Sequence, residues 1–576
     1  MFEYTGKILR INLNKNESWE EELTDEMIQK YMGGKGFGAK ILYDELKREV
    51  DPLSKENKII FATGPFTNNG VVSAGKNVVI TKSPLTGLFL DCYFGGGFGR
   101  ALKQTGFDVL IIEGKSQNPC YVLITDKVEI KDAKALWGKT TFETEKTLSS
   151  QGKVACIGPA GENLVRISSI FSEGRIAARG GVGAVMGSKL VKAVVVSGDK
   201  KSEVAHGDLL KKEVKILIKG LKESETTGNV LPTFGTSSLV NLMNEAGMLA
   251  TKNFKEGEFE KAEDISGEQI KKDLIRGYPC VPCPISCGRI ITGNIRGPEF
   301  ETLGLLGSNC GISDIETLYR ANYLCDAYGI DTISTGGTIA FAMELSEKGM
   351  IEEKIKWGDG KALIMLIEQI ARREGIGNLL SEGTKRVSEK VGGKEFAMHV
   401  KGMEFPAYDP RGSVGMALAY ATSDRGACHL RSYPLAEELW GDMDRFSYEG
   451  KAELVAGMQD MFASLYSLPS CFFVFFAFDK IGMKNYKRIL KAITGEEFDL
   501  DQIGERIWNT TRLFNVREGV SRKDDILPDR IMNESTKIGK KIDHEKFQQM
   551  LSEYYEIRGW DEEGIPKKEK IKELEL

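Results

Sequence analysis

Asp108-Val-Leu-Ile-Ile-Glu-Gly114 is the stretch that decides the fold class, because a short apolar, β-branched run that ends at glycine is typical of a buried strand. Four similar runs lie before and after it, and they start at Lys58, Asn77, Tyr121 and Lys192. Glycine-containing turns separate these runs. Together they predict a strand-rich first domain over residues 1–208.

Beyond residue 208 the apolar residues recur at the spacing of amphipathic helices with Glu- and Lys-rich faces. The clearest examples are 208–223, 315–328, 338–348 and 362–373. We expect one mainly helical domain over 209–400, a second over 401–576, and a solvated charged tail at 567–576. The predicted fold class is α+β, a strand-rich domain followed by two helical ones.

Composition excludes several classes of protein. The 576 residues suggest about three to four domains at roughly 150 residues each. The 78 Lys and Arg and the 83 Asp and Glu are mixed along the chain and give a net charge of −5, which argues against nucleic acid as a partner. The longest apolar stretch, around 472–478, is far short of the roughly 18 to 20 residues of a membrane span. The N-terminus lacks a signal-peptide pattern and ten cysteines are scattered along the chain, so we expect a cytoplasmic protein with reduced thiols.

The strongest chemical signal is the triplet Cys280-Val-Pro-Cys283-Pro-Ile-Ser-Cys287. Three thiolates in one loop can hold three corners of a [4Fe–4S] cube, and a distant fourth cysteine usually completes it. A zinc knuckle and a chance grouping of buried thiols are the alternatives. Zinc would need a nearby fourth ligand, and no histidine follows Cys287 within a hundred residues.

Two glycine-rich stretches are candidate ligand cradles. One runs from Phe94 to Gly99 and contains Gly95 and Gly96, and the other, from Arg179 to Gly187, contains Gly180, Gly181 and Gly183. Their backbone amides could approach an anionic or planar ligand, with Arg175 and Arg179 as phosphate-matching donors. Neither stretch matches the dinucleotide fingerprint or the P-loop, and structural turns remain the alternative.

Three further stretches carry polar groups suited to a site. Glu301 in Gly297-Pro-Glu-Phe-Glu301 and His429 in Arg425-Gly-Ala-Cys428-His429-Leu-Arg431 offer the carboxylate and imidazole most often used for proton transfer near neutral pH. A solvated glutamate and a core histidine are the plainer interpretations. The stretch 326–337 places acidic residues around a glycine, which an ordinary helix C-cap also explains.

Taken together, these stretches resemble the tungsten-containing aldehyde:ferredoxin oxidoreductase family nearly from end to end. The resemblance is carried by 81–87, 157–164, 179–189, 280–289, 297–301, 326–337, 406–412, 425–431 and 503–509. It implies a bis-pterin cofactor with tungsten, or molybdenum, that lies on the strand-rich domain and is enclosed by the two helical domains. It also implies a [4Fe–4S] cluster beside one pterin, and Mg²⁺ that bridges the pterin phosphates.

The resemblance also implies roles for individual residues. Glu301 and His429 would lie close to the tungsten as the catalytic pair, and Lys76 stands where a family arginine links the cluster to a pterin. The cluster ligands implied are Cys280, Cys283, Cys287 and Cys471. The pterin-binding residues implied are Asp326, Gly329, Ile330 and Asp331, which match D-x-x-G-[LI]-D, together with Arg425, Gly426, Cys428 and Arg431.

Several positions depart from the family pattern. The second pterin stretch, expected as D-x-x-G-[LI]-C, reads Tyr466-Ser-Leu-Pro-Ser-Cys471 and keeps only the cysteine. Arg320 and Tyr323 replace the Glu and His that hold a subunit-bridging iron in some members, so we expect no homodimer of that kind. Cys310 follows Glu301 in a region where a cysteine of some relatives approaches the metal, and a buried small hydrophobe is its alternative role.

The function that the resemblance implies is oxidation of a small aldehyde to a carboxylic acid with water. Electrons would pass through the cluster to ferredoxin or to a small ferredoxin-like iron–sulfur subunit. Glu301 would take the proton from the attacking water, and His429 would donate to the developing oxyanion. Two alternatives stay open, a catalytic subunit that reduces an aromatic acyl thioester of the benzoyl-CoA type and an electron relay without catalysis.

Overall fold

The computed structural model describes residues 2–576, and its N-terminal part contains two six-stranded sheets. The first sheet has the order β2-β1-β6-β3-β4-β5, in which only β1 and β6 run parallel. Its strands are β1 (Lys7–Asn12), β2 (Glu17–Glu22), β3 (Ile59–Ala62), β4 (Asn77–Lys82), β5 (Phe89–Phe94) and β6 (Val109–Glu113). The run 108–114 that predicted a buried strand is therefore β6, at the centre of this sheet.

The second sheet has the order β11-β10-β9-β12-β7-β8, with β7 and β12 parallel. Its strands are β7 (Cys120–Ile124), β8 (Val128–Asp132), β9 (Lys153–Cys156), β10 (Ile170–Ser172), β11 (Arg175–Ala177) and β12 (Val191–Val196). All six residues of β12 are buried, because elements cover both faces of this strand. The predicted strand-rich first domain is confirmed.

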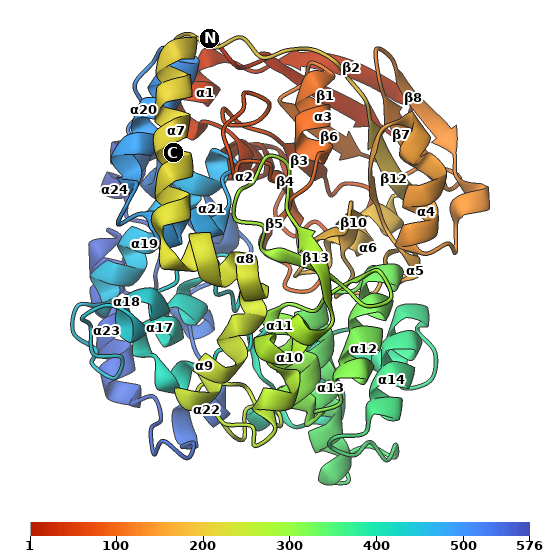
Figure 1. Cartoon of the computed structure of the whole chain (residues 1–576), viewed down its shortest axis with the longest axis vertical. Helices are drawn as coiled ribbons and strands as arrows, with labels where there is room; N and C mark the ends of the chain where they lie inside the picture. The colour runs from red at the N-terminus through yellow and green to blue at the C-terminus, as the bar shows by residue number, and fades with distance from the viewer. Residues whose placement is uncertain (1) are drawn as a thin grey trace.

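Helices make up most of the chain after residue 206 (Figure 1). The longer ones are α7 (Gly207–Glu223), α12 (Ile315–Tyr328), α13 (Thr332–Glu347), α14 (Gly360–Arg372), α17 (Val414–Thr422), α19 (Lys451–Ser467), α20 (Gly482–Thr494), α21 (Leu500–Arg517) and α23 (His544–Ile557). In Figure 1 the strand-rich part fills the upper right, the green helices the lower right and the cyan-to-blue helices the left. The α+β class is confirmed, whereas the domain boundaries at 208 and 400 stay a prediction.

Two short sheets complete the helical part. The three-stranded sheet β13-β14-β15 consists of β13 (Leu274–Tyr278), β14 (Gly288–Ile291) and β15 (Ile295–Arg296). The cysteine triplet lies in the loop between β13 and β14, so a β-hairpin carries all three thiols. The other sheet pairs β16 (His399–Val400) with β17 (Met403–Glu404).

One expectation from the sequence needs correction. The helix expected at 338–348 begins earlier, at Thr332, because the Asp331 carboxylate caps it by accepting hydrogen bonds from the amides of Ile333 and Ser334. The charged tail is mostly exposed to solvent, as expected. It also forms a short helix, α24 (Lys568–Glu573), and the Leu574 carbonyl accepts a hydrogen bond from Arg506 Nε of α21 at 2.8 Å.

No helix among residues 2–576 combines the length and the apolar character needed to cross a membrane.

Candidate functional site

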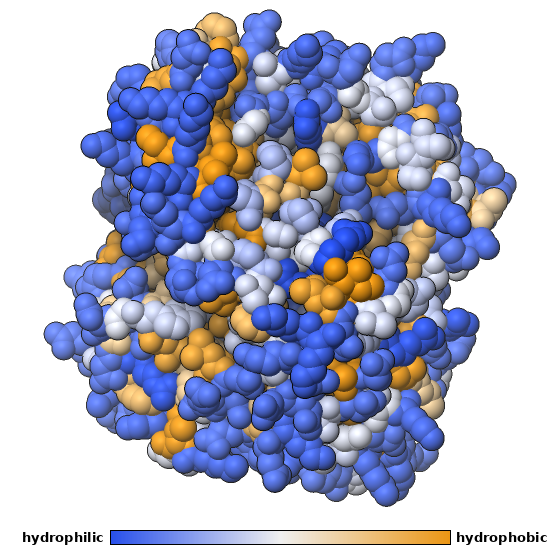
Figure 2. All heavy atoms as spheres, viewed as in Figure 1, coloured by the Kyte–Doolittle hydropathy of each residue, from blue (hydrophilic) through white to orange (hydrophobic). Residues whose placement is uncertain are grey.

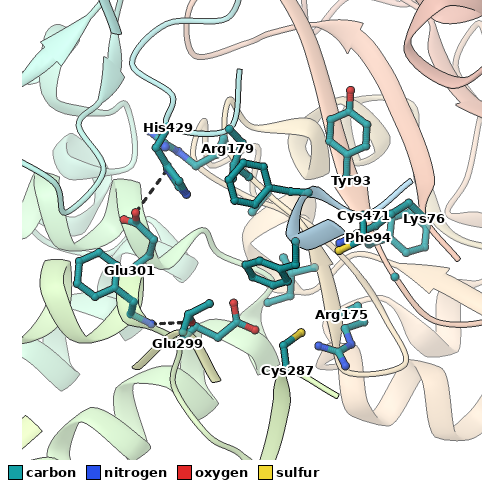
Figure 3. Close-up of a pocket in the computed structure, with 18 of the residues that line it drawn as sticks. Lys76, Tyr93, Phe94, Arg175, Arg179, Cys287, Glu299, Glu301, His429 and Cys471 are labelled. Atoms are coloured by element: carbon teal, nitrogen blue, oxygen red, sulfur yellow. Dashed lines mark hydrogen bonds and ion pairs between the residues drawn. The ribbon is translucent and has the colours of Figure 1, made fainter. Parts of the chain in front are cut away.

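A cavity of about 310 Å³ lies where the strand-rich part meets the helical parts (Figure 3). Residues from Ser73 to Phe476 line it, so it is assembled from segments far apart in the sequence. Its ionisable lining, thiols aside, is Lys76, Arg175, Arg179, Arg296, Glu299, Glu301, Asp331, Arg425 and His429. Cations outnumber carboxylates, and the cavity therefore favours an anionic occupant.

The four predicted cluster cysteines converge on one end of this cavity. Cys280, Cys283, Cys287 and Cys471 all line it. Ser73 ties their loops together: its amide donates to the Pro282 carbonyl at 2.9 Å, its carbonyl accepts from the Cys471 amide at 2.8 Å, and its hydroxyl lies 3.3 Å from Cys283 Sγ. One serine thus fixes the loop of the triplet against the distant fourth thiol.

A lysine lies beside the thiols, while burial raises the pKa of the Cys287 and Cys471 thiols. Burial opposes the charge on Lys76, but the neighbouring thiols of Cys471 and Cys280 raise the pKa of this lysine above its usual value. Gly95 is required here by packing, since a Cβ at that position would collide with Cys280 Sγ. Among residues 2–576 no three Cys, His, Asp or Glu groups are close enough together to share a single metal ion. Four thiols are the number of ligands that a [4Fe–4S] cluster takes, and the cluster stays a prediction.

Glu301 lies at the other end, on α11 (Phe300–Thr302). Its Oε2 accepts a hydrogen bond from the Ala407 amide at 2.9 Å, whereas Oε1 is buried without a hydrogen-bond partner in the described chain. A single turn of π-helix, Leu303–Gly307, follows α11 directly, and such turns are frequent at functional sites.

His429 faces Glu301 from the loop between α17 and α18 (Leu435–Leu439). His429 Nδ1 lies 3.4 Å from Glu301 Oε1, as Figure 3 shows. Burial raises the pKa of Glu301 to about 8. Burial, and then the positive charge of Arg179 and Arg425, lowers the pKa of His429 well below its usual value. The pair therefore combines a neutral imidazole with a carboxyl group that titrates close to neutral pH.

A network of buried charges holds the loop of His429 in place. Arg425 Nη1 donates to the Asp91 carbonyl at 2.7 Å, and Arg431 Nη2 donates to Asp91 Oδ1 at 2.5 Å. Lys35 Nζ lies 3.1 Å from Asp91 Oδ2 and also pairs with Asp424. Burial opposes the charge on Asp91, but Arg431 and Lys35 hold the pKa of its carboxyl well below the usual range. Arg431 itself does not line the cavity, and its guanidinium carbon lies 5.2 and 5.3 Å from the ring centres of two tyrosines that do, Tyr93 and Tyr466.

The stretch Asp326–Asp331 covers the end of α12 and the turn that leads to α13. Gly329 ends α12 in the left-handed conformation, with φ of 71°, so the helix C-cap interpretation is correct for this residue. Ile330 and Asp331 line the cavity, and Asp331 Oδ2 lies 3.1 Å from Arg179 Nε. Asp326 instead pairs with Arg296, with both oxygen–nitrogen distances at 3.0 Å.

Several predicted ligand residues lie outside the cavity wall. Gly181 and Gly183 make room for backbone, because a Cβ on either would collide with the carbonyl of Arg166 or Ser169. Four further residues also contact other parts of the chain. A Cβ on Gly180 would meet Leu90, one on Gly96 would meet Glu173, and one on Gly426 would meet Met403. Cys428 Sγ accepts a hydrogen bond from Arg425. Cys310 is buried and donates to the carbonyls of Leu305 and Gly336, and burial raises the pKa of its thiol. Cys310 is therefore placed as a small apolar side chain.

Other wall residues were not predicted. Arg296 and Glu299 line the thiol side of the cavity, although Glu299 stands in a motif that had been noted. An aromatic wall joins the two ends, and its members are Tyr93, Phe94, Phe300, Tyr408, Tyr433, Tyr466, Phe472, Phe473 and Phe476. Tyr408 contacts His429 at a ring distance of 5.4 Å. Stretches of the sequence singled out above contain most of these aromatic residues, namely 94–99, 297–301, 406–412, 466–471 and 472–478, but no motif predicted an aromatic wall.

The strand-rich part and the helical parts meet around one cavity. Its thiols, guanidinium groups and acid–imidazole pair are typical of an enzyme that binds a cofactor. The chain belongs to the aldehyde ferredoxin oxidoreductase family, a family of oxidoreductases. The family model described as "Aldehyde ferredoxin oxidoreductase, N-terminal domain" matches residues 8–198, and the one for domains 2 and 3 matches 212–576. The predicted family is confirmed.

Relatives of this family match along their whole length. The tungsten-containing aldehyde ferredoxin oxidoreductase of Pyrococcus abyssi is 44% identical, over 100% of this chain and 99% of the relative. The aliphatic sulfonate oxidoreductase, WOR-like subunit, of Pyrococcus furiosus is 30% identical over 100% and 97%. The solved active-site complex BamBC of benzoyl coenzyme A reductase with 1,5-dienoyl-CoA is similar with a TM-score of 0.86 and 26% identity, over 100% of this chain and 97% of that one.

Proposed function

We propose that this enzyme oxidises aldehydes to carboxylic acids with water as the oxygen source. Each turnover releases two electrons and two protons, and the electrons leave through a [4Fe–4S] cluster to a ferredoxin-type acceptor. One observation carries the proposal: a single cavity joins the buried Glu301–His429 pair to four converging thiols. The names of the relatives support both the substrate class and the acceptor.

The residues present fit an anionic bis-pterin cofactor. Arg179 Nη1 and Arg425 Nε, from two residues that line the cavity, are buried nitrogens without a hydrogen-bond partner in residues 2–576. Unpaired buried guanidinium donors are costly, and the phosphates and dithiolene sulfurs of the pterins would satisfy them. Arg179, Arg425, Asp331 and Lys76 would hold the cofactor, and Cys280, Cys283, Cys287 and Cys471 would hold the cluster. The bound tungsten, or molybdenum, supplies a Lewis acid and an acceptor for two electrons; Mg²⁺ between the phosphates stays a prediction.

The chain's own groups supply the proton chemistry. With a pKa of about 8, Glu301 is a base matched to neutral or mildly alkaline pH, and its Oε1 is free to take a proton from water. His429 remains neutral, and a neutral imidazole still has one N–H to donate to a developing oxyanion. The aromatic wall excludes water from the rest of the cavity.

The test is oxidation of short aliphatic and aromatic aldehydes with a viologen dye as acceptor. Glu301→Gln should lower turnover by about 10² to 10⁴, because a proton-transfer role is typically worth that much, while iron and tungsten contents remain unchanged. Glu299→Gln changes a carboxylate on the thiol side of the same cavity, so it is the matched control and should lose less than about tenfold. Full turnover in Glu301→Gln would contradict the assignment.

A second candidate reaction is reduction of an aromatic acyl thioester at low potential. The similarity to the benzoyl coenzyme A reductase complex and the altered stretch 466–471 favour it. Incubation with benzoyl-CoA and a strong reductant decides between the two reactions. A protein that carries the cluster but turns over neither substrate would be an electron relay.

A further inference from the structure

The two most exposed large hydrophobic side chains in residues 2–576 belong to the hairpin that carries the thiols. Val281 is 64% exposed and lies between Cys280 and Cys283, and Ile275 on β13 is 57% exposed. Within 275–282 only Tyr278 and Cys280 are partly covered, and the other six residues are exposed. A single exposed hydrophobe needs no explanation, but two of them beside a buried redox site indicate a contact surface.

The strand that carries Ile275 is also an open edge. β13 is the outer strand of its sheet and pairs only with β14. Natural proteins usually protect such edges, because unpaired backbone groups accept another chain. In Figure 2 an apolar patch lies where Figure 1 has β13, with hydrophilic groups next to it.

The charges beside this hairpin select the partner. Lys271, Lys272 and Arg276 are exposed, and none of them pairs with a carboxylate among residues 2–576. Lys271 and Arg276 instead stack on the aromatic rings of Phe234 and Tyr278, at 4.9 and 5.6 Å. Three unpaired cations around an apolar pair complement an acidic surface with an apolar centre.

We propose that the hairpin surface, residues 271–282, docks a small acidic iron–sulfur protein that receives electrons from the thiol end of the cavity. The proposal rests on the proposed function, since it names where the acceptor binds. One of the thiols, that of Cys280, belongs to this surface, and Cys283 follows directly after it, so the partner would sit over the electron source. Each bound acceptor takes one electron, and two acceptor molecules leave reduced for every aldehyde oxidised.

The experiment compares two electron acceptors on the purified holoenzyme, a small acidic ferredoxin and methyl viologen. Ile275→Glu and Arg276→Glu should each raise the KM for ferredoxin about tenfold or more and leave turnover with methyl viologen within about twofold, because a small dye needs no docking surface. The dependence of ferredoxin kcat/KM on salt should also become weaker in Arg276→Glu.

Matched controls are Ile526→Glu, which changes a hydrophobe that is 49% exposed elsewhere, and Lys361→Glu, which reverses an exposed charge on α14. Both should behave as the parent enzyme with either acceptor. Unchanged ferredoxin kinetics in both hairpin variants would overturn the docking site. So would a dimer, measured by light scattering, that Ile275→Glu dissociates, because the surface would then be occupied by a second copy.

Direct binding separates this proposal from the proposed function. Calorimetric titration with the ferredoxin should show weaker binding to Arg276→Glu even if neither acceptor supports aldehyde oxidation. In that case the proposed reaction fails and the docking surface stands. Equal binding by the parent and both hairpin variants would instead overturn the docking surface alone.

Discussion

The two ends of the cavity are built in opposite ways. At the thiol end, backbone hydrogen bonds through Ser73 join loops that are partly exposed. At the carboxylate end, the loop of His429 is held by buried charges, above all the network of Asp91, Lys35 and Arg431, and Glu301 is held by the Ala407 amide. The difference matches the proposed tasks: electrons must reach a partner at the surface, whereas proton transfer needs groups shielded from water.

The largest effect is expected when a thiol is removed from the thiol end. Cys287→Ser should abolish cluster assembly and lower activity by at least about 10³, because a site with three thiols cannot complete four iron corners. Iron content and visible absorption measure the outcome. Cys310→Ser is the matched control, since serine can donate to the same Leu305 carbonyl, and it should keep both iron and activity. Normal iron content in Cys287→Ser would remove this residue from the ligand set.

The next test concerns stability at the carboxylate end. Lys35→Met removes one partner from a fully buried ion network and leaves Asp91 and Asp424 less compensated, which should lower the free energy of unfolding by about 3–5 kcal/mol. Lys40→Met on the same helix, α2 (Gly34–Glu45), breaks a partly exposed pair with Asp44 and should cost less than about 1 kcal/mol. Urea unfolding midpoints compare the two variants. Equal losses of stability would contradict the view that buried charges stabilise the carboxylate end.

The carboxylate end should also determine the pH dependence. Burial raises the Glu301 pKa to about 8, so this group is protonated, and inactive as a base, below that pH. We expect kcat/KM with viologen to rise with pH and to level off above about 8, falling roughly tenfold per pH unit below it. In the Glu301→Gln variant, kcat/KM should no longer rise with pH in this range. A parent profile that is flat between pH 6 and 8 would exclude Glu301 as the titrating base.

The smallest effect is expected at Ser73. Ser73→Ala removes one hydroxyl contact with Cys283 Sγ but leaves both backbone hydrogen bonds in place, so the protein should keep its iron and lose less than about 1.5 kcal/mol of stability. The cluster potential should become more negative, because hydrogen bonds to sulfur stabilise the reduced state. Redox titration followed by EPR measures the shift. An unchanged potential would show that the hydroxyl does not act on the cluster.

The sequence predicted the main elements because their signals are local. The run 108–114 became β6, and the helical spacing at 315–328 became α12. The start of α13 was missed because a capping aspartate, and not hydrophobic spacing, sets it. The tail is mostly exposed, as predicted, but its hydrogen bond with α21 could not be predicted because this contact is tertiary.

The sequence motifs predicted the main residues at the two ends of the cavity, but not the residues of its walls. The four cysteines and the pair Glu301 and His429 do line one cavity. Glycine density did not distinguish ligand contact from backbone packing, which is what Gly181 and Gly183 provide. Arg296 carried no motif of its own, and its position depends on a pairing with Asp326 that only the folded chain shows.

The connection through Ser73 also has a bearing on how the protein is made. Synthesis reaches the triplet near the middle of the chain and reaches Cys471 only when most of the chain has been made. A nascent chain can thus present three thiols without the fourth. The complete set of thiols exists only after residue 471 has been added, and a chain that ends before this residue would bind iron incompletely.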